Sequence, residues 1–138
     1  TADQVEELVV KERMRYGANR LTLMERFPET QFVDYTKIFS RLGKGPANLH
    51  LTFSRAENND AECLRALAAG HNVAIVFGAG LPDTWNGYPV INGDLHDLRH
   101  RDPKGCVVGL SPKGAKAKRD MSGFVLRDYA ACGWRQAA

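Results

Sequence analysis

The sequence contains few cysteines and no long apolar run, and these two absences exclude several classes of protein. Its 138 residues include only Cys63, Cys106 and Cys132, with no CxxC pair. Such spacing excludes a disulfide framework and argues against a zinc cluster, so we expect reduced, structural thiols in a reducing cytosol. No stretch approaches the ~20 apolar residues of a membrane-spanning helix, and the first residues lack the apolar segment of a signal peptide. We therefore expect a cytoplasmic protein with no membrane partner.

The chain also lacks a strong excess of charge of either sign. Nineteen Lys and Arg residues face sixteen Asp and Glu residues, which leaves a net charge of +3. This balance permits an acidic partner without requiring one. The apolar share of 43% suffices for a hydrophobic core, and the length fits one unit. We predict a single α/β domain over residues 1–138.

The hydrophobic pattern predicts alternating helices and strands in roughly the first eighty residues. We expect helices over 3–16, over 19–27 with Asn19 as its cap, and over 59–69 with Gly70 as its stop. Strands are expected over 31–35, 48–54 and 72–78, with a short helical turn after the first of them. The uninterrupted apolar run at 72–78 is typical of a central parallel strand that is buried on both faces.

The second half predicts irregular β structure. We expect strands over 88–91 and 105–110, the first near a sheet edge because Pro89 has no N–H for the ladder. Residues 79–87 read as a long turn, and residues 123–134 fit either a strand or a short helix. The predicted fold class is thus α/β, with a small, mostly parallel sheet flanked by helices. It would be partial-barrel-like, with irregular β structure in the C-terminal half.

Charged side chains are most dense in residues 90–105, which allow a metal site, a catalytic site or a surface loop. The weak catalytic candidates are acidic, imidazole and ammonium side chains near predicted strand ends: Asp34, Lys37, Asp94, His96 and Asp97. Two arginines, Arg99 and Arg101, lie beside these carboxylates, would pair with them and would oppose a bound cation. We therefore favour a salt-bridged surface loop and predict no metal site.

A second cluster is basic and lies in residues 109–123. Four cations occur within seven residues, spaced by Gly and Ala: Lys113, Lys116, Lys118 and Arg119. Small residues between cations let a backbone approach phosphates closely, so this segment is a candidate phosphate or nucleic-acid contact. The alternative is a solvated lysine loop.

Two glycine-containing segments are weaker candidates. The loop after the predicted central strand could contact a small molecule, because open α/β sheets bind ligands at the carboxyl ends of their strands. Its candidate residues are Gly78, Gly80, Asp83 and Trp85, although the GxGxxG pattern is absent. The segment SRLGKGPANLH precedes a strand instead of following one, so we interpret it as a simple turn and not as a phosphate cradle.

The chain resembles the C-terminal half of uncharacterised bacteriophage proteins over roughly residues 20–125. The likeness rests on these residues: Asp34-Tyr35-Thr36-Lys37, Asn48, Thr52-Phe53-Ser54, Gly93-Asp94 with Asp97 and Arg99, and Lys113-Gly114. Those phage proteins resemble radical-SAM-type (β/α) half-barrels, so the resemblance implies a phage origin and a partial barrel. The iron–sulfur motif CxxxCxxC is absent here, which argues against radical chemistry, and we expect no cofactor.

Two functions fit these observations. The favoured one is a small phage-type binding protein, acting in the host cell cytosol without catalysis. Its basic loop would bind nucleic acid or a nucleoprotein, and inhibition of a host defence complex is one such role. A host protein is the other possible partner. The alternative is an enzyme, or part of one, that acts on a phosphorylated or nucleotide substrate with the Asp, His and Lys groups at strand ends.

Overall fold

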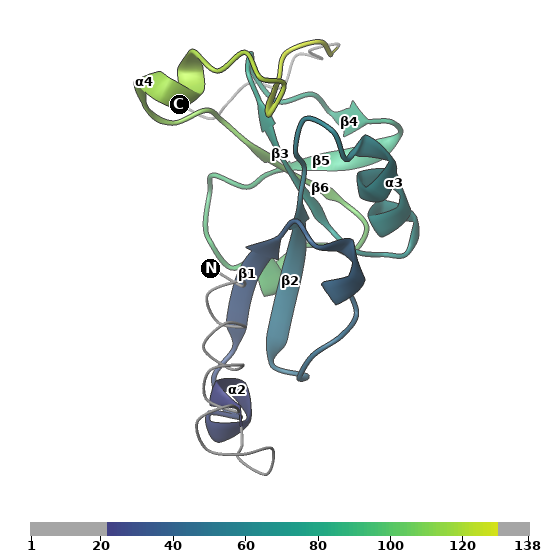
Figure 1. Ribbon diagram of the computed structural model, residues 1–138, viewed down its shortest axis with the longest axis vertical. Helices are drawn as coiled ribbons and strands as arrows, with labels where there is room; N and C mark the ends of the chain where they lie inside the picture. The colour runs from purple at the N-terminus through teal and green to yellow at the C-terminus, as the bar shows by residue number, and fades with distance from the viewer. Residues whose placement is uncertain (1–21, 130–138) are drawn as a thin grey trace.

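The computed structural model describes residues 22–129 (Figure 1). They form one seven-stranded sheet in the order β1-β2-β3-β6-β5-β4, with β7 also paired to β3. Every pairing is parallel except that of β4 with β5. The strand bounds are β1 Phe32–Thr36, β2 Leu49–Ser54, β3 Val73–Phe77, β4 Thr84–Trp85, β5 Tyr88–Asn92, β6 Val107–Leu110 and β7 Val125–Leu126. The predicted α/β class with a mostly parallel sheet is confirmed, and the sheet is not closed into a barrel.

The helices of the described residues are short. They are α2 Leu23–Arg26, α3 Asp60–Ala68 and α4 Gly114–Lys118, with 3-10 turns η1 Phe39–Arg41 and η2 Arg99–Arg101. Thr22 caps α2 by accepting a hydrogen bond from the Glu25 N–H at 3.2 Å, and the predicted cap at Asn19 lies outside the described residues. The predicted helix over 3–16 lies outside the described residues, as does Cys132. No helix within residues 22–129 is long and apolar enough to cross a membrane.

The strand β3 lies at the centre of the sheet, as its apolar run predicted. Val73 and Ile75 are fully buried, and parallel neighbours flank β3 on both sides. On one side, β2 pairs with Val73 and Ala74 and β7 pairs with Val76 and Phe77. The neighbour of β3 therefore changes halfway along its length.

The helix α3 covers one face of the sheet and builds the main core. Cys63, Ala66 and Leu67 of α3 pack with Phe53 and other buried side chains of β2, β3 and β6. The helix begins after Asn59 and ends before Gly70, which adopts a φ of +88°. Gly70 occupies the left-handed position that commonly follows a helix end. The predicted helix over 59–69 is thus confirmed.

The opposite face is crossed by residues 93–105, and η2 lies against β1 and β2 (Figure 1). A smaller core of Ala74, Cys106 and Val108 packs on this face. The second half contains short strands between long loops, as predicted, but two loops hold more structure than expected. The segment 79–87 includes β4, which forms a hairpin with β5 through Asn86 and Gly87 at positive φ. The lysine-rich segment includes α4, and the described part of 123–134 forms β7.

Candidate functional site

The basic side chains predicted to contact phosphates surround α4, which projects beyond the sheet at the top left of Figure 1. This helix follows the carboxyl end of β6. Its Gly114 has a φ of +80° and open space around it, so the turn into the helix depends on glycine. All four predicted cations are exposed: Lys113, Lys116, Lys118 and Arg119. The structure therefore brings them together on one exposed segment.

Asp94 binds two residues at the start of this segment. Its carboxylate lies 3.1 Å from the Lys113 ammonium and accepts a hydrogen bond from the Ser111 backbone N–H at 2.9 Å. Partial burial alone would raise the pKa of Asp94, but the hydrogen bonds from Ser111 and Lys113 outweigh it and hold that pKa below its ordinary value. A carboxylate with a lowered pKa is a poor proton acceptor at neutral pH. Asp94 thus links the ends of β5 and β6.

Arg127 is a fifth cation at this site that the sequence did not single out. Its guanidinium donates hydrogen bonds to the carbonyl oxygens of Lys118 at 2.9 Å and Asp120 at 3.1 Å. It therefore satisfies backbone oxygens at the carboxyl end of α4, where a cation also complements the helix dipole. In the sequence, the only signal of this role is the position of Arg127 directly after the apolar segment 124–126. We call the five side chains the basic surface: Lys113, Lys116, Lys118, Arg119 and Arg127.

The glycine loop after β3 is closed by Tyr129. The Tyr129 hydroxyl accepts from the Ala79 N–H and donates to the Gly80 carbonyl, both at 2.6 Å. Of the other predicted contacts in this loop, Trp85 is buried in the main core, whereas Asp83 is exposed. Gly78 lies against Arg127, because a Cβ atom there would be 2.8 Å from Arg127 Nη1.

The predicted catalytic side chains are separate. Asp34 lies in the middle of β1, and Lys37 Nζ lies 4.9 Å above the Phe124 ring. His96 Nδ1 accepts the Leu98 N–H at 3.0 Å, and the Asp97 carbonyl accepts the Arg99 N–H at 3.0 Å. Within residues 22–129, no hydrogen bond or ion pair joins any two of Lys37, Asp94, His96 and Asp97. Nor do three or more His, Cys, Asp or Glu side chains gather there as a metal site would require.

Residues 93–105 contain an ion pair, as predicted, but not on the surface. The side chains of Arg99 and Asp102 are 1% and 2% exposed, with Arg99 Nε 3.1 Å from Asp102 Oδ2. That contact lacks the alignment of a hydrogen bond, whereas Arg99 Nη2 donates to the His96 carbonyl at 2.6 Å. The prediction of a surface loop was wrong here because η2 turns Arg99 under the sheet, beside Gly93. Of the two arginines in this segment, Arg101 is the exposed one.

A protein-family model matches most of this chain. The family model described as Gene product 88 matches residues 12–128. No curated protein matches the chain, and no solved structure matches it. The family supports the phage part of the resemblance, while the radical-SAM-type half-barrel stays a prediction.

Proposed function

The chain belongs to the Gene product 88 family of phage-type proteins, and on that premise we propose that it binds nucleic acid, or a nucleoprotein, through the basic surface around α4. The supporting observation is the exposure of four cations on the projecting segment 113–119 at the carboxyl end of the sheet, with the exposed Arg127 beside the end of α4. Open α/β sheets commonly bind ligands at this end.

Two lysines of α4 are the strongest contacts in this proposal. Lys116 and Lys118 are exposed, and within residues 22–129 neither takes part in an ion pair. The nearby carboxylate of Asp120 is engaged by the Ser122 hydroxyl at 2.9 Å and by the Val125 N–H at 3.3 Å. Both lysines are therefore available to phosphate oxygens, which supply most of the sequence-independent affinity for nucleic acid.

Binding of this kind positions a protein on the phosphate backbone without reading bases. We therefore expect similar affinities for different sequences. Inhibition of a host defence complex, with α4 on its nucleic acid, is one role that such binding would serve. The enzymatic alternative is less favoured, because Asp94 holds the β5 and β6 ends together and the other candidate side chains lie apart.

The test is the salt dependence of binding to labelled DNA and RNA that carry 5′-hydroxyl ends, followed by fluorescence anisotropy. Neutralised phosphates release counterions, so each lost contact should lower the log–log salt slope by about one unit. We expect Lys116→Ala/Lys118→Ala to reduce the slope by about two units and to weaken binding to all sequences alike.

The matched control is Arg65→Ala/Arg101→Ala, which removes the same charge from exposed side chains outside the basic surface. This control should keep the wild-type slope. Equal slopes for the α4 variant and the wild type would refute the proposal. So would an equal loss in the control, because the effect would then reflect net charge alone.

A further inference from the structure

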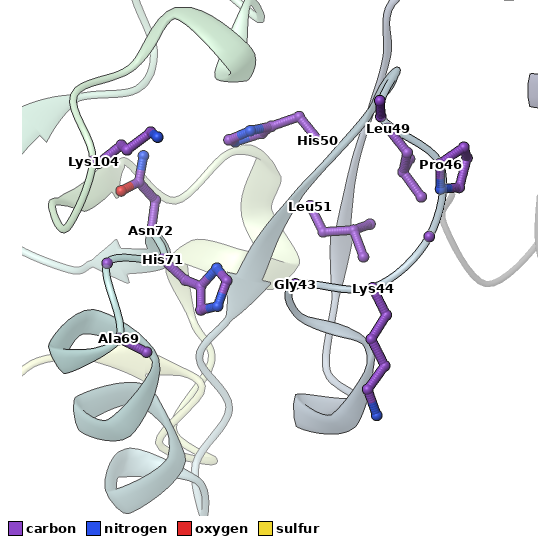
Figure 2. Close-up of a pocket in the computed structure, with 13 residues that line it drawn as sticks. Gly43, Lys44, Pro46, Leu49, His50, Leu51, Ala69, His71, Asn72 and Lys104 are labelled. Atoms are coloured by element: carbon purple, nitrogen blue, oxygen red, sulfur yellow. The ribbon is translucent and has the colours of Figure 1, made fainter.

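A second basic site lies at the other end of β6, away from the basic surface. A pocket of about 430 Å³ opens between the loop 43–47, the start of β2, the turn from α3 into β3, and Lys104 (Figure 2). Lys104 precedes the amino end of β6, whereas Lys113 follows its carboxyl end. The two sites are therefore separated by the length of this strand.

The stagger of two strands creates the pocket. β3 pairs with β2 only at Phe53 and Ser54, so within the described residues Leu49–Leu51 have no strand neighbour on that side. The loop after η1 closes part of this space. Gly43, with a φ of +74°, lies so close to His71 that a Cβ atom there would be 3.6 Å from His71 Cε1. The Gly-Lys-Gly segment is thus a wall of the pocket and more than a simple turn.

The ionisable side chains that line the pocket are all basic. Among the lining residues are two lysines and two histidines, Lys44, Lys104, His50 and His71, and no aspartate or glutamate. Leucine, proline and alanine side chains supply the remaining walls. Lys44 points away from the other polar groups in Figure 2, so it contributes charge and not a direct contact. Such a lining suits an anion that carries an organic group.

Asn72 supplies an independent sign of a missing acceptor. Its side chain is only 3% exposed, and its Oδ1 accepts the Cys106 N–H at 3.0 Å, which fixes the orientation of the amide. Within residues 22–129, the amide nitrogen has no hydrogen-bond acceptor. In Figure 2 this amide points toward Lys104 and His50. This nitrogen is not among the fully buried polar atoms that lack a partner, so it is open to the pocket, and an anion there would accept a hydrogen bond from it.

We infer that this pocket binds a phosphomonoester, with Asn72, Lys104, His50 and His71 around the phosphate and the apolar walls around the organic group. The pocket volume falls in the range of roughly 300–1,000 Å³ that is typical of small-molecule sites. Burial lowers the pKa of His50, and a bound dianion would favour the protonated ring. The phosphomonoester could belong to a free mononucleotide or to the 5′ end of a nucleic acid.

The first experiment follows the histidine ring signals of the full chain by NMR during titration. The four histidines are His50, His71, His96 and His100, and single His→Gln variants assign their signals. Inorganic phosphate and adenosine monophosphate should shift the signals of His50 and His71 saturably, and His96, outside the pocket, should not respond. Adenosine, which lacks the phosphate, should bind at least about tenfold more weakly, because charge-assisted hydrogen bonds are lost.

The second experiment measures the affinity for adenosine monophosphate by calorimetry in two variants. Lys104→Ala removes an exposed cation, and Asn72→Asp keeps the acceptor for Cys106 but replaces the free donor with a charged oxygen. Each should weaken binding at least about tenfold. If circular dichroism shows that Asn72→Asp does not fold, the affinity of Lys104→Ala alone tests the inference. Lys116→Ala/Lys118→Ala should bind the nucleotide like the wild type, which keeps this inference separate from the proposed function.

Comparison of oligonucleotides with and without a 5′ phosphate distinguishes the two sources. A preference for the phosphorylated end over the free mononucleotide would identify a chain terminus as the ligand, and the reverse would identify a nucleotide. Three results would overturn the inference. These are unchanged histidine signals with every phosphate compound, wild-type affinity in Lys104→Ala, and equal affinity for adenosine and adenosine monophosphate.

Discussion

Replacement of Arg99 by methionine should strongly destabilise the fold, although Arg99 lies in the most highly charged segment of the chain. The substitution removes the cation and leaves the Asp102 carboxylate, 2% exposed, without its counter-charge. Removal of one partner from a buried ion pair typically costs about 3–5 kcal/mol. Loss of the hydrogen bond from Arg99 to the His96 carbonyl acts in the same direction, because that oxygen then needs another donor.

The double variant Arg99→Met/Asp102→Asn should be more stable than Arg99→Met alone. It leaves no buried charge, and replacement of both partners of a buried pair is often close to neutral. The difference between the single and double variants therefore measures how much of the loss comes from the unpaired carboxylate. We expect the double variant to recover at least about 2 kcal/mol of the lost stability.

The assay is urea unfolding followed by circular dichroism, with Arg101→Met as the matched control. Arg101 lies two residues away and is exposed, so its replacement should change the free energy of unfolding by no more than about 0.5 kcal/mol. Arg99→Met should lower the free energy of unfolding by about 3–5 kcal/mol, and a thermal melt should show a melting temperature lower by roughly 10–20 °C. If Arg99→Met is as mild as Arg101→Met, the ion pair does not hold residues 93–105 on the sheet and the reasoning fails.

Two further predictions concern titratable groups. Burial raises the pKa of Cys63 to about 12 and that of Cys106 to about 11, so both thiols should react slowly with Ellman's reagent in the native protein. In denaturant, three free thiols should be counted for the three cysteines of the chain, and a lower count would reveal a disulfide. Hydrogen bonds from Ser111 and Lys113 outweigh the effect of burial and keep the pKa of Asp94 below its ordinary value of 3.8. The ionised carboxylate therefore stabilises the fold above pH 3.8. This stabilisation is lost as the pH falls through the pKa of Asp94 in the folded protein. Asp94→Asn should therefore cost about 1 kcal/mol at pH 6 and clearly less below about pH 3, and urea unfolding with equal stabilities at pH 6 would contradict this.

The first half of the fold was predictable because its signals are local. The apolar run of β3, the alternation in β2 and the glycine after α3 each lie within one short window of sequence. The pairing of β7 with β3 was not predictable, because it joins Val76 to Val125 across a long sequence separation. A two-residue strand has too little pattern of its own, so tertiary contacts determine it.

Gly93 shows how a correct local interpretation can miss the physical cause. The Asn-Gly-Asp sequence is a good turn former, and the chain does turn there. The structure adds a second reason, because a Cβ atom on Gly93 would lie 2.6 Å from Arg99 Nη1 and would also collide with Val108. Gly93 therefore allows close packing over the buried arginine. No composition rule separates this use of glycine from its use in a turn.

The two cationic sites also differ in whether their signal is local in the sequence. The basic surface was visible in the sequence because four of its five cations lie within seven consecutive residues. The pocket was missed because its polar residues come from distant segments, and each has an ordinary interpretation when read alone. Only the stagger of β2 and β3 brings His50 and Asn72 to one space, and only the turn before β6 adds Lys104. Because the two sites lie at opposite ends of β6, a variant that loses one site should keep the other. Binding of a nucleic-acid backbone by the basic surface and binding of a phosphomonoester by the pocket can therefore be measured independently.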